Sequence, residues 1–206
     1  MNSEMYEIFF NIQKKHWWFQ TKKEIVLKAI EKFNDAKGQI KILDIGCGSG
    51  LMLNSLEKIG EVSGMDMSDD AIGFSGKIFN GRVLKGWLPD KVPFPENHFD
   101  LIVALDVIEH IEDDFGSLES IRKHLKAHGK AIITVPAYMF LWSPFDDKNE
   151  HKRRYRRSEL KKKLLAAGFK IEKLSYYNFF LFPAVFIVRK LNMILGRDGA
   201  VDVVGY

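Results

Sequence analysis

Hydrophobic positions near the N-terminus recur at the three- and four-residue spacing of a helix face. The residues of this face are Val26, Ala29, Ile30 and Phe33. The pair Asn34-Asp35, followed by Gly38, is typical of a helix end. The first 38 residues are therefore expected to form a helical cap.

Beyond this cap, short apolar runs alternate with helical stretches. Asp100–Leu105 and Lys130–Val135 are almost continuously apolar, which is typical of strands covered on both faces. The alternation predicts a Rossmann-like, doubly wound α/β fold with a mostly parallel sheet and N-terminal helices. Ligands bind such sheets at the carboxyl ends of the strands. Further strands are expected at Lys41–Ile45, Glu61–Met67, Arg82–Lys85 and Lys170–Tyr177, and helices at Leu51–Ile59, Asp69–Phe79, Phe115–Leu125 and from Ser158 to Gly168.

The chain of 206 residues contains no repeat, low-complexity tract or linker that would divide it. Its length suits one α/β domain with a proper core. A single domain over residues 1–206 is therefore expected. It would comprise the helical cap (1–38), the Rossmann-like core (39–178) and an apolar C-terminal segment (179–206).

A glycine-rich loop follows the first predicted strand, with the sequence DIGCGSG at positions 44–50. Glycines allow the backbone to turn sharply and to approach a ligand closely. A nicotinamide-binding loop has the spacing G-x-G-x-x-G, but Leu51 occupies the last glycine position here. Asp66 ends the next strand, twenty residues beyond Gly46. An acidic residue in that place suits hydrogen bonding to ribose hydroxyls.

The stretch LDIGCGSG followed by GMDMS resembles the first two signature motifs of class I S-adenosylmethionine-dependent methyltransferases. In that family the glycine loop wraps the methionine part of the cofactor and the acidic residue binds the ribose. The resemblance implies these roles for Gly46, Gly48 and Asp66. It also implies that Asp44 supports the loop and that Met67 binds the cofactor.

The stretch LPDKVPFPENHFDLIVALDVIEHIED resembles the family's segment from the third strand through the fourth. The resemblance implies that Trp87 and Leu88 flank the adenine and that Leu105 meets the cofactor at the end of the fourth strand. The family often has Gly-Asp where this chain has Gly86-Trp87. The adenine amine would then lose an acidic partner, and the indole could stack on the ring instead.

A narrower resemblance links HWWF, LWSPFDDKNEHKRRY, AAGF and YYNFFLFP to a subgroup of bacterial methyltransferases. The subgroup pattern D-x-x-x-x-H-x-R-R-Y is matched by Asp146, His151, Arg153, Arg154 and Tyr155. The carboxyl end departs from the family. A final antiparallel strand is expected there, but GRDGAVDVVGY is short and glycine-rich for one.

Three residues are candidates for a catalytic role: His110, His151 and Arg154. A sulfonium methyl group is electrophilic without help, so much of the rate can come from positioning the acceptor. A neutral imidazole near an acceptor hydroxyl can remove its proton. Residues 138–155 are expected to form a lid over the methyl group, with His151 or Arg154 facing the acceptor. Either histidine could instead be structural, and Glu109-His110 could hold a divalent metal; two such residues are weak support, so no metal is assigned.

The absence of certain motifs narrows the chemical class of the methyl acceptor. No Asn/Asp-Pro-Pro-aromatic sequence follows the fourth strand, which argues against the usual amino-directed adenine and glutamine enzymes. Cys47, the one cysteine, lies in the glycine loop and is badly placed for cytosine chemistry. A small-molecule or lipid-linked acceptor, methylated at oxygen, is favoured, and no nucleic acid is expected. A nucleic-acid-directed enzyme and a non-catalytic cofactor-binding or membrane-associated protein remain alternatives.

Positive charge is concentrated in one stretch. The net charge is +4, whereas residues 152–163 hold eight Lys or Arg and one Glu. This stretch can be a solvated helix face or can contact phosphate or an anionic membrane surface. The most apolar segment, Phe179–Leu195, can pack on the core or on a homodimer partner, or can lie in a membrane interface. A single cysteine and no secretory signal suggest a cytoplasmic protein, with peripheral membrane contact as a further hypothesis.

Overall fold

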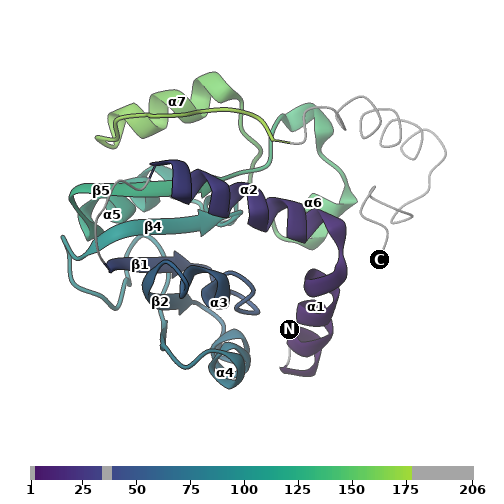
Figure 1. Ribbon diagram of the computed structural model, residues 1–206. Coiled ribbons are helices and arrows are strands. Elements are labelled where there is room, and N and C mark those ends of the chain that lie inside the picture. The colour runs from purple at the N-terminus through teal and green to yellow at the C-terminus, as the bar shows by residue number, and fades with distance from the viewer. Residues whose placement is uncertain (1–2, 34–38, 178–206) are drawn as a thin grey trace.

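Five parallel strands form the sheet at the centre of the protein. The computed structural model describes residues 3–33 and 39–177. Within them the strands lie in the order β3-β2-β1-β4-β5 (Figure 1). The chain moves outward from β1 in one direction and then returns to its other side, so the sheet has a switch point between β1 and β4. The strands are β1 (Ile40–Ile45), β2 (Gly60–Asp66), β3 (Arg82–Lys85), β4 (Phe99–Leu105) and β5 (Leu125–Thr134).

Helices connect the strands and cover the sheet, which confirms the predicted doubly wound α/β fold. The helical cap consists of α1 (Ser3–Lys15) and α2 (Trp17–Phe33). The helices within the core are α3 (Leu53–Leu56), α4 (Asp69–Ile78), the short 3₁₀ helix η1 (Ile108–His110) and α5 (Asp114–His124). After β5 come η2 (Met139–Leu141), α6 (Pro144–Lys148) and α7 (Arg157–Ala166).

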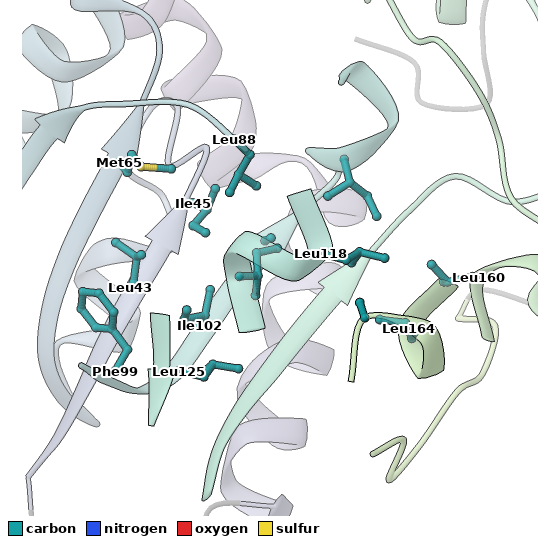
Figure 2. Packing of buried hydrophobic residues seen from close by; sticks show 14 of the residues in the cluster. Leu43, Ile45, Met65, Leu88, Phe99, Ile102, Leu118, Leu125, Leu160 and Leu164 are labelled. Carbon is teal, nitrogen blue, oxygen red and sulfur yellow. The ribbon is translucent and has the colours of Figure 1, made fainter. Parts of the chain in front are cut away.

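Two hydrophobic clusters pack against opposite faces of the sheet. Neighbouring residues of a strand point to opposite faces, and Ile42 and Leu43 of β1 accordingly belong to different clusters. The cluster that contains Leu43 includes residues of α5 and α7, among them Leu118 and Leu164 (Figure 2). The other cluster includes residues of α2 and α3. Burial on both faces explains why the strands contain nearly continuous apolar runs.

The carboxyl ends of the strands meet at one edge, and the cap covers part of it. The arrowhead of β4 points toward the side of the molecule on which α1 and α6 lie (Figure 1). Phe10 of α1 packs against Phe74 of α4, with ring centroids 5.5 Å apart. The Ser49 hydroxyl of the glycine loop donates a hydrogen bond to the Gln13 side chain of α1. The cap therefore lies beside the edge at which a ligand is expected.

Three local expectations were wrong. The helix predicted over Leu51–Ile59 is reduced to the single turn of α3, because Gly50 and the turns around it keep the preceding residues in the loop. Helix α7 starts one residue before Ser158, which therefore lies inside the helix and does not cap it. Lys170–Tyr177 forms no strand. Its apolar residues Ile171 and Leu174, like the preceding Phe169, pack against the α5/α7 cluster, so their pattern indicates burial without strand pairing.

The segment Phe179–Leu195 and the expected final antiparallel strand lie outside the described residues. In the part of the chain that the structure describes, none of the helices combines the length and apolar character needed to span a bilayer.

Candidate functional site

The glycine loop between β1 and α3 adopts a conformation that requires glycine. Gly46, Gly48 and Gly50 have φ angles of 68°, 52° and 76°, in the left-handed region that other residues rarely adopt. A Cβ atom on Gly46 would lie 2.7 Å from Cγ2 of Val107. The loop is anchored because the N–H of Gly46 donates to the Met65 carbonyl over 2.7 Å. The predicted loop residues are therefore held in one tight turn against the end of β2.

Asp66 links this loop to the end of β2. Its Oδ2 accepts a hydrogen bond from the Gly48 N–H at 2.8 Å, and its Oδ1 accepts one from the Ser68 N–H at 2.9 Å. The side chain is partly exposed. Each carboxylate oxygen can accept more than one hydrogen bond. Asp66 thus keeps acceptor capacity for a diol while its orientation is fixed by two backbone donors.

Asp44 lies beneath the loop, buried to 3% exposure. Burial, with the nearby charge of Asp66, raises the pKa of Asp44 to about 7, although Lys22 opposes the rise. Lys22 itself forms a 2.5 Å ion pair with Asp106. Burial raises the pKa of Asp106, but the charge and hydrogen bond of Lys22 outweigh it and bring the pKa below its usual value. The helical cap therefore supplies the cation that balances acids at the strand ends.

The other predicted cofactor residues differ in accessibility. Trp87 is 41% exposed, and the Lys91 ammonium lies 4.6 Å from its ring centroid, so one face of the indole is already covered. Met67 is largely exposed beside Asp66. Leu88 is buried in the core near Ile45, so a ligand would meet its backbone more readily than its side chain (Figure 2). Leu105 is half-buried at the end of β4.

Glu109 of η1 is fully buried, and both of its carboxylate oxygens lack a hydrogen-bond partner among the described residues. Burial, together with the charge of Asp106, raises the pKa of Glu109 well above its usual value. A buried polar group without a partner costs free energy, on the order of 1–3 kcal/mol or more for a charged group. Such a group in a native protein calls for a chemical explanation.

His110 and His151 lie next to Glu109, although 41 residues separate them in the sequence. Their ring centroids are 4.7 Å apart with the planes nearly perpendicular. Burial lowers the pKa of His110, and the neighbouring His151 lowers it further. One ligand atom from each of Glu109, His110 and His151 lies within 4.8 Å of the other two. The structure thus brings together the two histidines that the sequence analysis singled out separately.

Asp146 fixes the orientation of His151. The carboxylate Oδ1 lies 2.8 Å from Nδ1 of His151. Arg154 binds the same carboxylate through Nε and one terminal nitrogen, both at 2.8 Å, and its other terminal nitrogen donates to the Ala137 carbonyl. Arg154 is only 8% exposed. Of the two residues predicted to face the acceptor, His151 or Arg154, the second has its guanidinium engaged in this buried ion pair, which suits a positioning role for Arg154.

Backbone and side-chain contacts tie the segment after α6 to η1 and α5. The Lys152 N–H donates to the Glu109 carbonyl over 2.8 Å. Asp114 of α5 accepts hydrogen bonds from the Tyr155 hydroxyl and from Lys163, and Arg153 pairs with it at 3.2 Å. The predicted lid over residues 138–155 thus contains η2 and α6 and is anchored at its end.

Sequence reasoning missed Lys22, Gln13 and Asp114, which complete the surroundings of the site. Lys22 contacts Asp106 across 84 positions, and Asp114 meets its partners 39 to 49 positions away. No local pattern marks such long-range pairs. The D-x-x-x-x-H-x-R-R-Y pattern marked Arg153 and Tyr155, but it gave no sign that both contact Asp114.

A separate groove of about 530 Å³ opens beside the lid. Three aromatic residues form one part of its lining, and Tyr138 stacks on Tyr176 with ring centroids 5.3 Å apart. The other part is basic. The complete lining is Tyr138, Phe140, Arg156, Arg157, Ser158, Lys161 and Tyr176.

Comparison with known proteins identifies a family. A family model described as a methyltransferase domain matches residues 15–174. The mitochondrial ubiquinone biosynthesis O-methyltransferase of Schizosaccharomyces pombe is 27% identical over 148 residues, which cover 61% of this chain and 53% of that protein. The chain spans about half the length of the curated relatives it matches.

Solved structures share the fold. In the complex of the Haloferax volcanii Trm112 methyltransferase activator with a methyltransferase, the similar chain has a TM-score of 0.66 and 19% identity, covering 79% of this chain and 73% of that one. Phosphoethanolamine N-methyltransferase 2 of Haemonchus contortus, solved with S-adenosyl-L-methionine, gives a TM-score of 0.63 and 18% identity, covering 83% of this chain and 42% of that one. At these identities the similarity establishes the fold alone.

Proposed function

The chain belongs to the class I S-adenosylmethionine-dependent methyltransferases, and from that premise we propose that it methylates a hydroxyl oxygen of a small-molecule or lipid-linked acceptor. The observation that carries the proposal is the arrangement at one edge of the sheet. A tight glycine loop braced by Asp66 lies on one side of the switch point, and Glu109 and His110, which follow β4 on the other side, meet His151 there.

The residues of the loop fit the cofactor. Gly46 and Gly48 leave the backbone bare where a side chain would block a close approach, and Asp66 offers carboxylate oxygens to the ribose hydroxyls. Asp44 and Lys22 set the charge beneath the loop. Trp87 and Met67 provide exposed apolar surface for the adenosine, and Leu88 next to Trp87 and Leu105 at the end of β4 are the remaining apolar candidates. Bound S-adenosylmethionine supplies an electrophilic methyl group on a sulfonium.

The histidine cluster would act on the acceptor. Because its surroundings lower the pKa of His110, this imidazole is neutral near pH 7 and has a lone pair available. His151 is oriented by Asp146 through one nitrogen, so its other nitrogen is the one that can reach a ligand. Either nitrogen can accept the proton of a hydroxyl group held in line with the methyl group.

An oxygen acceptor is preferred because several relatives, including those of Schizosaccharomyces pombe and Rickettsia canadensis, are named ubiquinone biosynthesis O-methyltransferases. Acceptors of that pathway are therefore the first to test. The basic groove beside the lid provides a place for an anionic or amphiphilic part of the acceptor, and peripheral membrane contact and a homodimer remain part of the proposal. Nucleic acid is the less favoured acceptor, because three of the cations in residues 152–163 are engaged in internal ion pairs.

Transfer of a labelled methyl group from S-adenosylmethionine tests the proposal. The purified protein is incubated with hydroxylated aromatic intermediates of ubiquinone biosynthesis and, separately, with RNA. Label is expected in the small molecules as a methyl ether. His151→Gln should lower the rate by roughly 10²–10⁴-fold, the usual contribution of a positioned acid or base, while His128→Gln on exposed β5 surface should not. Label appearing only in RNA would overturn the proposal.

A further inference from the structure

We propose that Glu109, His110 and His151 bind one divalent transition-metal ion, with zinc as the best match. The inference deepens the proposed function, on which the role of the ion in methyl transfer rests; the binding itself does not depend on it. Among the described residues, these three form the one group of His, Cys, Asp or Glu side chains spaced to hold an ion.

The spacing of the ligand atoms is close to that of a filled site. All three atoms lie within 4.8 Å of one another. Bonds from zinc to histidine nitrogen or carboxylate oxygen are about 2.0–2.2 Å long, so two ligands of one ion can be at most about 4.4 Å apart. Small rotations of the imidazole rings would close the remaining gap.

The charge of the cluster also favours a cation. Glu109 is fully buried, and neither carboxylate oxygen has a partner among the described residues. A carboxylate in this setting must take up a proton or bind a cation. Two imidazoles that share the space with it provide the additional ligands that a metal ion needs and a proton does not.

The surroundings of His151 match those of a metal-bound imidazole. A metal-ligating histidine usually donates its second ring N–H to a carboxylate or a backbone carbonyl. His151 meets the Asp146 carboxylate through Nδ1 at 2.8 Å, and Arg154 holds that carboxylate in place. The backbone of Asn149 lies near His110. His151 therefore has one nitrogen committed to the protein and one available to an ion.

The ligand set indicates the class of metal. Imidazole suits zinc, copper, iron and nickel, whereas magnesium and calcium prefer oxygen ligands. Two histidines and one glutamate leave a tetrahedral zinc ion with one open position, as in catalytic zinc sites. With both imidazoles bound to the ion, an acceptor hydroxyl at the open position would lose its proton to solvent instead of to a histidine. Its oxygen would then bond to the methyl carbon as the bond from that carbon to sulfur breaks.

Zinc binding to the full chain, freed of metal by a chelator and carrying no histidine tag, tests the inference. The titration is followed by calorimetry with zinc chloride in competition with a chromophoric chelator. Glu109→Gln and His151→Gln remove one ligand each, and His128→Gln removes an exposed histidine outside the cluster. Thermal melting of each metal-free variant checks its folding. Glu109→Gln should fold at least as well as the original chain, because it removes a buried carboxylate.

The original chain and His128→Gln are expected to bind one zinc ion per chain. Both ligand variants should bind it about 100-fold more weakly or worse, since even loss of an outer-sphere partner commonly costs 10–100-fold. Absence of stoichiometric zinc binding, a preference for magnesium, or unchanged affinity in folded Glu109→Gln would each overturn the inference. S-adenosylmethionine binding is measured separately on the metal-free protein. Zinc binding without cofactor binding would contradict the proposed function and leave the metal site standing.

Discussion

The surroundings of Asp44 disfavour the charged form of its carboxyl group. Burial raises its folded-state pKa from 3.8 to about 7. The folded chain therefore keeps a proton that the unfolded chain releases, so this residue's contribution to stability is complete below about pH 4 and is lost as the pH rises toward 7. Three pKa units correspond to about 4 kcal/mol as an upper value.

Replacement of Asp44 by Asn should remove this pH dependence. Chemical denaturation of the cofactor-free protein at pH 5 and pH 8 is expected to show that the Asn variant gains stability relative to the original chain as the pH increases. Asp70→Asn, on the exposed start of α4, serves as the control and should follow the original chain. Parallel pH profiles for the original chain and Asp44→Asn would mean that Asp44 is not protonated when folded.

Glycine at position 46 is required by both conformation and space. An alanine there must adopt a φ of 68° and place its Cβ 2.7 Å from Val107. We expect Gly46→Ala to destabilise the protein by roughly 1–3 kcal/mol and to weaken cofactor binding. Gly73 lies in α4 with nothing within 4 Å of its Cβ position. Gly73→Ala should instead stabilise the helix by roughly 0.5–1 kcal/mol. Urea unfolding measures the stability of both variants. Equal effects of the two substitutions would contradict the constraint on Gly46.

At the scale of elements, the segment from α6 to Tyr155 determines where His151 lies. Arg154→Lys keeps the charge but loses the two-pronged contact with Asp146 and the bond to Ala137. We expect a loss of roughly 1–3 kcal/mol in unfolding free energy together with weaker zinc binding. Arg156→Lys, at an exposed position, should change stability by less than about 0.5 kcal/mol. If Arg154→Lys were as stable as the original chain and bound zinc with unchanged affinity, the pair of Arg154 and Asp146 would not be what positions His151.

Local rules predicted those elements whose cause is local. Strand β3 has the predicted bounds, and the glycine loop was recognised because left-handed turns and tight approaches require glycine at fixed positions. The segment 170–177 was misread because alternating apolar residues also arise in an irregular segment packed on a core. The contacts of Lys22 with Asp106 could not be predicted, since they depend on how α2 lies on the finished sheet.

At the scale of the whole molecule, the basic run 152–163 is divided by the fold. Arg153, Arg154 and Lys163 turn toward acidic partners. Arg156, Arg157 and Lys161 instead line the aromatic groove. Of these two groups, only the second offers charge to an external anionic surface, and the remaining basic residues of the run, Lys152 and Lys162, are exposed as well. Tests of membrane contact should therefore reverse the charges of the second group, because reversing the charges of the first group would break internal ion pairs.

Sedimentation with anionic vesicles should reveal any such contact. Each basic residue near an anionic surface contributes about 1 kcal/mol. Arg156→Glu with Arg157→Glu should therefore weaken binding by about tenfold or more at low salt, and salt should weaken binding of the original chain. Lys28→Glu with Lys32→Glu, on the exposed surface of α2, changes the net charge equally and should have less effect. Equal losses for the two pairs, or no vesicle binding at low salt, would exclude the groove as a membrane contact.

The central claim is that the edge of the sheet built from the glycine loop and Asp66 binds S-adenosylmethionine. Calorimetric titration of the purified protein measures this directly, with Asp66→Asn as the variant and Asp70→Asn as the control. The original chain and the control should bind S-adenosylmethionine equally well. Asp66→Asn should bind it about 10–100-fold more weakly, because hydrogen bonds to a charged group are worth roughly 1.5–3 kcal/mol. Failure of the original chain to bind S-adenosylmethionine, or equal binding by Asp66→Asn, would contradict the account.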